Sequence, residues 1–197
     1  MNYLAHAVLS FGNEEILVGN MVSDFVKGRS QFLYPETVRR GITLHRIIDQ
    51  YTDGHETTAM AKSFFRPAYR LYSGALVDVV YDHFLACDDR EFPGETLSFF
   101  SESTYAVIGR HIQLLPLQFA LMFPYMRSQD WLLSYRQREG IRNSFIGIRR
   151  RARYIEETET AFAIFEAKYD ELAACYREFF PKLREFAKQI LSEMLEM

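Results

Sequence analysis

The stretch GALVDVVYDHFLAC, residues 74–87, decides the fold of this chain. Drawn as a helix, it has apolar side chains in nearly every direction, which is typical of a central, buried helix. Asp78 and Asp82 interrupt this pattern four residues apart, so they share one face. A buried carboxylate without a partner costs several kcal/mol or shifts its pKa until it is neutral, and two neighbouring carboxylates also repel. A bound cation is the simplest partner for both.

The remainder of the chain predicts one helix after another, and no alternating pattern typical of strands competes. Only 6 Pro and 10 Gly occur in 197 residues, and 48% of the residues are hydrophobic, which suffices for a substantial core. We therefore predict an all-α fold, a single-domain helical bundle over residues 1–197. The expected helices besides 74–87 cover residues 2–11, 14–26, 35–52, 56–65, 95–115, 117–126, 129–135, 136–154, 159–180 and 182–197.

Nothing in the sequence indicates a membrane or an export route. It has no apolar run of about eighteen residues, and its first residues lack the basic and small-residue features of a secretory leader. Cys87 and Cys175 lie far apart and form no CxxC pair, as is typical of reduced thiols. We expect a cytoplasmic protein with no membrane contact.

A second polar pair lies in GITLHRIIDQYTDGH, residues 41–55. On a helical wheel, His45 and Asp49 fall within the apolar side, whereas the arginines of this segment fall on the opposite, wet side. Residues four apart on a helix have their Cβ atoms about 5–6 Å from each other. His45 and Asp49 can therefore touch the same object.

Two further segments repeat this arrangement. Asn20 and Asp24 lie four residues apart in a mostly apolar helix, and His6 lies among apolar residues in the first helix. Imidazoles and carboxylates without thiolates suit Mn²⁺, Mg²⁺ or Fe²⁺. We predict one shared metal site; the alternative is that these groups form separate structural hydrogen bonds. The predicted metal ligands are Asp24, His45, Asp49, Asp78, Asp82 and His6.

The charge of the chain is uneven, although its net value is only −3. Seven arginines and one glutamate lie between residues 136 and 153. This basic stretch is either a docking surface for an anionic partner or a solvated arginine face. Nucleic acid is not expected as the partner, because the stretch has no base-stacking platform or recognition-helix motif and the whole chain is acidic.

Five blocks of the sequence resemble the acyl carrier protein phosphodiesterases, also called ACP hydrolases. The blocks are MNYLAH (1–6), GNMVSDFVKG (19–28), GITLHRIIDQYTDGH (41–55), ALVDVVYDHFLA (75–86) and SYRQREGI (134–141). The resemblance implies a cytoplasmic, all-helical enzyme that is a divergent relative of the HD-type metal phosphohydrolases. Such an enzyme uses Mn²⁺ or another divalent metal to hydrolyse the phosphodiester joining 4′-phosphopantetheine to a serine of holo-acyl carrier protein. The adjacent His-Asp order of HD proteins is reversed here, at Asp82-His83.

The resemblance suggests roles for polar residues near the predicted metal. A divalent cation lowers the pKa of a bound water, and a nearby cation such as Lys27 or Arg29 can assist at the phosphoryl oxygens. The alternative for these two residues is a cationic cap at the end of a helix. His55 or His83 can serve as general acid for the departing serine, and His83 can instead orient a ligand. The predicted catalytic residues are Asp24, His45, Asp49, Asp78, Asp82 and His83.

The basic stretch gains a specific partner from the same resemblance. Acyl carrier proteins are small and strongly acidic, so a basic helix would steer one onto the enzyme. The predicted substrate-binding residues are Lys27, Arg29, His55, Arg149, Arg150 and Arg151. Two other functions stay open: a phosphohydrolase that acts on a small nucleotide, and a non-catalytic helical binding protein. The sequence does not predict an oligomeric state.

Overall fold

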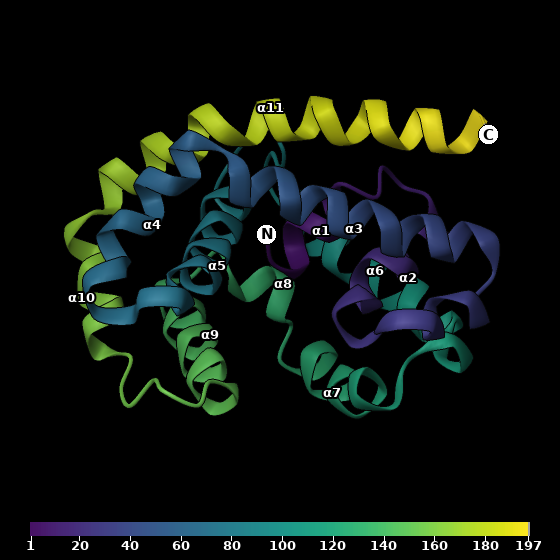
Figure 1. The fold of residues 1–197 in the computed structure, drawn as a ribbon, viewed down its shortest axis with the longest axis horizontal. Helices are drawn as coiled ribbons and strands as arrows, with labels where there is room; N and C mark the ends of the chain where they lie inside the picture. The colour runs from purple at the N-terminus through teal and green to yellow at the C-terminus, as the bar shows by residue number, and fades with distance from the viewer. Residues whose placement is uncertain (197) are drawn as a thin grey trace.

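The structure, a computed structural model, describes residues 1–196 and consists of helices joined by short connections (Figure 1). The predicted all-α fold class is confirmed, and residues 1–196 contain no strand. No helix in this range is both long and apolar enough to cross a membrane. The α-helices are α1 (Tyr3–Val8), α2 (Glu14–Val22), α3 (Glu36–Gly54), α4 (Glu56–Tyr69), α5 (Ser73–Ala86), α6 (Thr96–Arg110), α7 (Leu117–Ser128), α8 (Trp131–Ser134), α9 (Arg138–Arg151), α10 (Glu159–Ala167) and α11 (Tyr169–Glu196). The short 3₁₀ helices are η1 (Ser23–Phe25), η2 (Gly28–Leu33), η3 (Arg70–Tyr72) and η4 (Ile112–Leu114).

Helix α5 is the central, buried helix that its sequence predicts. It contacts α1, α4, α9 and α11, and in Figure 1 it lies between α4 and the N-terminus of the chain. Its large apolar side chains, among them Leu76, Val80 and Tyr81, are fully buried. Its polar residues Asp82 and His83 are buried as well, so each must find a partner inside the protein.

Helices α2 and α3 form the most extensive helix pair, and two glycines allow it. A Cβ atom on Gly19 would lie 2.0 Å from the carbonyl oxygen of Val38, and one on Gly41 would lie 2.3 Å from the carbonyl oxygen of Ile16. Only glycine permits backbones to approach this closely. The contact brings the end of α2 beside the middle of α3, which carries His45.

Helix α11 runs along the top of the molecule in Figure 1, over α3 and α4. The predicted break near residue 181 is wrong, because Pro181 lies inside α11 and the break falls between α10 and α11, at Lys168. An interior proline costs about 3 kcal/mol. Phe179, Phe180 and Leu183 are fully or almost fully buried on both sides of Pro181, and their packing offsets this cost.

Two other helices end at residues different from those predicted. The helix predicted over 56–65 continues through Pro67 to Tyr69, because Phe65 and Tyr69 are buried and anchor its last turn. The helix predicted over 14–26 ends at Val22, and Asp24 lies in the 3₁₀ turn η1. Asp24 therefore does not share a helix face with Asn20, although both residues contact His45.

Candidate metal centre

Three predicted ligands converge on one point. His6 comes from α1, and His45 and Asp49 come from successive turns of α3. One ligand atom from each lies within 4.8 Å of the others. The Nε2 atom of His6 lies 3.2 Å from Oδ1 of Asp49, and Nε2 of His45 lies 3.2 Å from Oδ2 of Asp49. The Oδ1 atom of Asp24 is also 3.2 Å from Nε2 of His45, so the turn η1 supplies a second carboxylate.

Asn20 fixes the orientation of both imidazole rings. Its side-chain Nδ2 donates to the carbonyl oxygen of His6 at 2.8 Å and to Oγ of Ser10 at 3.1 Å, so its Oδ1 faces Nδ1 of His6 at 2.8 Å. Its backbone oxygen accepts from Nδ1 of His45 at 2.7 Å. Because both acceptors are oxygens without a proton, each Nδ1 donates. The Nε2 atom of each neutral ring then has no proton and carries a free lone pair.

Both lone pairs point at carboxylate oxygens, which also carry lone pairs. Two such groups repel unless a proton or a metal cation lies between them. The Nε2 atom of His6 is buried and has no hydrogen bond of acceptable geometry, although Asp49 is 3.2 Å away. Two imidazole nitrogens and two carboxylates, with their orienting partners in place, fit a divalent cation.

The pKa values explain why protons alone do not fill the gaps between the imidazole nitrogens and the carboxylate oxygens of this site. Burial and the neighbouring His45 lower the pKa of His6 to about 4. Burial alone would lower the pKa of His45, but Asp24 and Asp49 raise it to about 9. Burial opposes the ionisation of Asp49, but His45 and His6 hold its pKa well below the ordinary value. Near neutral pH only His45 therefore carries a second ring proton, and the Nε2 of His6 stays available to a metal.

Asp78 and Asp82, predicted as ligands, are not among the three residues whose ligand atoms converge. Asp78 is 3.1 Å from the α-amine of Met1, which is also 3.2 Å from Oδ1 of Asp49. Asp82 accepts hydrogen bonds from the backbone amides of Leu4 at 2.7 Å and Ala5 at 3.2 Å. Asp82 therefore holds the start of α1, the helix that carries His6, while Asp78 borders the centre through Met1.

The other predicted histidines have partners elsewhere. The Nδ1 atom of His83 lies 2.8 Å from the carbonyl oxygen of Tyr135, and its Nε2 lies 2.8 Å from the hydroxyl of Tyr169. The Nδ1 atom of His55 accepts from the backbone amide of Thr57 at the start of α4. Neither ring is brought to the His6–His45–Asp49 cluster.

The predicted cationic residues lie on the surface. Lys27 and Arg29 are exposed at the start of η2, and neither forms an ion pair within residues 1–196. Arg149, Arg150 and Arg151 are exposed in the last turn of α9. In the described part of the chain, none of these three is paired with a carboxylate, so their positive charges are available to a partner.

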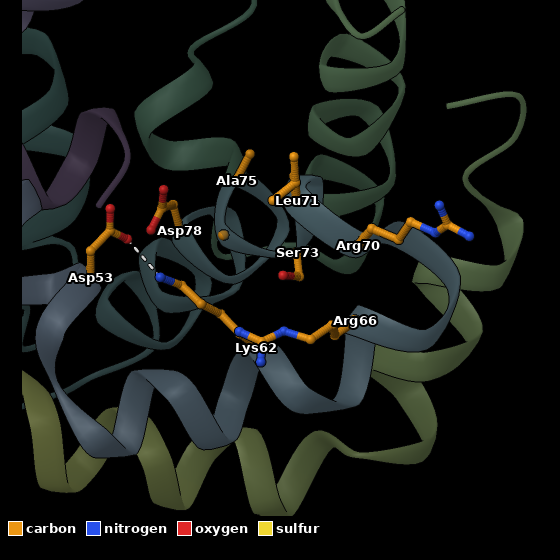
Figure 2. A pocket seen from close by; sticks show the side chains of 9 residues that line it. Asp53, Lys62, Arg66, Arg70, Leu71, Ser73, Ala75 and Asp78 are labelled. Carbon is orange, nitrogen blue, oxygen red and sulfur yellow. Dashed lines mark hydrogen bonds and ion pairs between the residues drawn. The ribbon is translucent and has the colours of Figure 1, made fainter. Parts of the chain in front are cut away.

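An open cavity of about 570 Å³ is lined in part by Asp78, the residue that borders the centre through Met1. Figure 2 shows Asp53 and Asp78 at one end and Arg70 at the other, with the side chains of Lys62 and Arg66 between them. Lys62 donates to Asp53 at 2.6 Å. Sequence reasoning missed Lys62, Arg66 and Arg70, because they come from α4 and η3 and no spacing in the sequence relates them to the ligands on α1 and α3.

Comparison with known proteins supports one family. A family model described as acyl carrier protein phosphodiesterase matches residues 1–183. Proteins of that name from Photorhabdus laumondii, Serratia proteamaculans and Yersinia pestis are 30%, 31% and 31% identical to this chain. The matches cover 95% of this chain and 96%, 98% and 98% of those proteins. No solved structure matches the chain.

Proposed function

This chain belongs to the acyl carrier protein phosphodiesterase family, and we propose that its centre hydrolyses holo-acyl carrier protein with the help of a divalent cation. The products are apo-acyl carrier protein and 4′-phosphopantetheine. The observation that carries the metal requirement is the pair of His6 and His45 Nε2 atoms directed at carboxylate oxygens. The donor set of imidazoles and carboxylates, without thiolate, favours Mn²⁺, with Mg²⁺ or Fe²⁺ as alternatives.

Each residue of the centre has a separate task in this proposal. His6, His45 and Asp49 hold the cation, and Asp24 adds a carboxylate from the exposed side. A bound divalent cation supplies an activated water and neutralises charge on the phosphoryl oxygens. Asn20 keeps both rings turned toward the cation, as hydrogen-bonded neighbours of ligands generally do.

The side on which Asp24 lies is the expected route for the substrate. The side chains of Asp24 and Asp49 are 68% and 39% exposed, whereas those of His6 and His45 are only 3% and 7% exposed. The cavity that carries Lys62, Arg66 and Arg70 adds positive charge beside Asp78. These cations would favour approach of the anionic diester.

Docking of the protein substrate is assigned to the basic end of α9. Arg149, Arg150 and Arg151 are exposed and form no ion pair within residues 1–196. Their charge complements an acidic carrier protein and would raise the rate of productive encounter. Lys27 and Arg29 stay predictions, as do a cytoplasmic location and the likeness to HD-type enzymes.

The direct test is incubation of the purified protein with holo-acyl carrier protein and Mn²⁺, followed by mass spectrometry of the carrier protein. We expect loss of the phosphopantetheine group, with no loss when the metal is chelated. Asp49→Asn should reduce the rate and the Mn²⁺ affinity by roughly a hundredfold or more, since it removes a ligand. Glu36→Gln is the matched control, because Glu36 is exposed on the same helix and, among residues 1–196, forms an ion pair only with half-buried Arg40.

Two results would point to the other functions. Release of phosphate from nucleotides, with intact holo-carrier protein, would favour a nucleotide phosphohydrolase. Equal metal content and equal stability of the wild type and Asp49→Asn, without hydrolysis of either substrate, would favour a binding protein.

A further inference from the structure

A second cavity, of about 650 Å³, lies among α1, α5, α7, α8 and α9. It is separate from the cavity in Figure 2, although the two meet neighbouring residues of α5: Asp78 lines the first and Val79 lines the second. Its volume falls within the range of about 300–1,000 Å³ that is usual for small-molecule sites. Arg150 and Arg151 in its lining belong to the docking surface proposed for α9, and the proposed hydrolysis uses no other part of the cavity.

This cavity borders the metal centre through the first residues of the chain. Asn2 and Tyr3 line it, and the neighbouring Met1 amine lies 3.2 Å from Asp49. Burial raises the pKa of Tyr3 to about 12, with Arg151 opposing and Asp24 reinforcing the shift. The hydroxyl of Tyr3 donates to Sδ of Met122 at 3.8 Å, so this side chain belongs to the cavity lining and comes from the same helix, α1, as His6 of the metal centre.

The lining combines three kinds of group. Amide side chains come from Asn143 and Gln129, and apolar surface comes from Trp131 and Met122. Arg150 and Arg151 add positive charge to the same lining. A cavity of this kind suits a long, flexible ligand with several amide groups, apolar stretches and one anionic end.

We propose that this cavity holds the pantetheine arm of the substrate, with the phosphate end toward Tyr3 and the metal centre. The inference rests on the proposed function, because pantetheine is the part of the substrate that leaves with the phosphate. The pantetheine arm, joined to phosphate through its primary hydroxyl, has two amides, one free hydroxyl, two methyl groups on one carbon and a terminal thiol. Its amides match Asn143 and Gln129, and its methyl groups match the aromatic and thioether surface.

Gly147 offers a way to close this cavity without disturbing the fold. It lies on α9 in the cavity lining, and a Cβ atom added there meets no atom within 4 Å. The first atom of an added side chain would therefore meet open space, and the change from glycine also favours the helix. Gly109 on α6 is the matched control, because a Cβ atom there also meets nothing within 4 Å and Gly109 is not part of the cavity.

The experiment measures binding of pantetheine and of 4′-phosphopantetheine to the Mn²⁺-loaded full-length protein by calorimetry. We expect Gly147→Leu to weaken both at least tenfold, and to reduce kcat/KM for holo-acyl carrier protein by a similar factor. Gly109→Leu should match the wild type in its affinity for pantetheine, its affinity for 4′-phosphopantetheine and its kcat/KM for holo-acyl carrier protein. Mn²⁺ affinity within about twofold of the wild type would show that the metal centre of Gly147→Leu is intact.

The outcomes separate this inference from the proposed function. Unchanged pantetheine binding by Gly147→Leu, or equal losses in Gly109→Leu, would overturn the inference even if holo-carrier protein is hydrolysed. If the wild type binds pantetheine, Gly147→Leu does not, and neither hydrolyses holo-carrier protein, the cavity assignment stands and the proposed function fails. Absence of pantetheine binding to a hydrolytically active wild type would also overturn the inference.

Discussion

The imidazole rings of His6 and His45 stack with their centroids 3.8 Å apart and their planes within 13° of parallel. They come from different helices, yet Asn20 accepts a hydrogen bond from Nδ1 of each ring. Their Nε2 atoms consequently reach the two oxygens of a single carboxylate, that of Asp49. Two protonated rings at this separation would repel strongly, so the stack is best stabilised by one cation that both rings share.

Replacement of Asn20 should disturb the metal centre without touching a ligand. In Asn20→Ala the imidazole of His6 loses the acceptor of its Nδ1 proton, whereas the backbone oxygen that accepts from His45 remains. We expect Mn²⁺ affinity to fall about 10–100-fold. The buried Nδ1 donor of His6, left unpaired, should also lower the free energy of unfolding by about 1–3 kcal/mol. Asn13→Ala is the control: it removes the cap of α2 and should cost about 1 kcal/mol with Mn²⁺ affinity unchanged. Equal Mn²⁺ affinity in the two variants would contradict the orienting role of Asn20.

Asp82 should make the metal-free protein less stable as pH rises from about 4 to 7. Burial raises its pKa from 3.8 to about 7, although the amides of Leu4 and Ala5 oppose the shift. Between these values the unfolded chain has released the proton and the folded protein still holds it, so stability is present at low pH and is lost as pH rises. The loss is on the order of a few kcal/mol, at about 1.4 kcal/mol per pKa unit.

Denaturant unfolding from pH 4 to 8 measures this effect. Asp82→Asn should be less stable at pH 4, because the amide nitrogen that replaces one carboxyl oxygen cannot accept from a backbone donor. Its profile should also be flatter than that of the wild type. A variant profile parallel to that of the wild type would show that another group causes the slope.

The glycine contact between α2 and α3 should tolerate no added methyl group. Gly41→Ala would place a Cβ atom 2.3 Å from the carbonyl oxygen of Ile16, so the helices must separate. We expect a loss of about 1–3 kcal/mol in the free energy of unfolding and weaker Mn²⁺ binding, because His45 moves away from Asn20. Gly54→Ala at the end of the same helix has open space around it and should be neutral or stabilising by up to about 1 kcal/mol. Urea unfolding and Mn²⁺ titration of both variants check this.

Reversal of charge at the end of α9 should impair the protein substrate selectively. Replacing Arg149, Arg150 and Arg151 by glutamate should lower the ratio of kcat/KM for holo-acyl carrier protein to that for a small phosphodiester by roughly tenfold or more. The difference should shrink as salt is added, because the attraction is screened. Reversal of the exposed residues Arg177, Lys182 and Lys188 on α11 is the control and should leave the ratio unchanged. Equal loss on both substrates would argue against docking at α9.

The sequence predicted the fold class and most helices because local pattern decides them. Helix α5 is apolar on nearly every side and is buried as expected. The errors occur where packing overrides a local signal. Pro181 is a strong breaker in isolation, but Phe180 and Leu183 anchor the chain on either side of it, and the helix continues.

For the candidate centre, the sequence indicated residues that lie four apart on one helix, and the structure places His45 and Asp49 together with His6. It could not indicate which carboxylates meet the imidazoles, since that depends on how helices cross. Asp82 and Asp24 illustrate the difference. Asp82 accepts hydrogen bonds from the backbone of α1. Asp24 lies on a turn rather than on the expected helix, and its carboxylate reaches His45.

The placement of Asp24 has a consequence for the kinetics of ion exchange. His6, His45 and Asp49 are carried by α-helices, whereas Asp24 sits on a three-residue 3₁₀ turn with its side chain 68% exposed. Short turns of this kind open locally at a far lower free energy than packed helices. The helical ligands would thus determine which ion is selected, and the turn would determine how fast that ion enters and leaves.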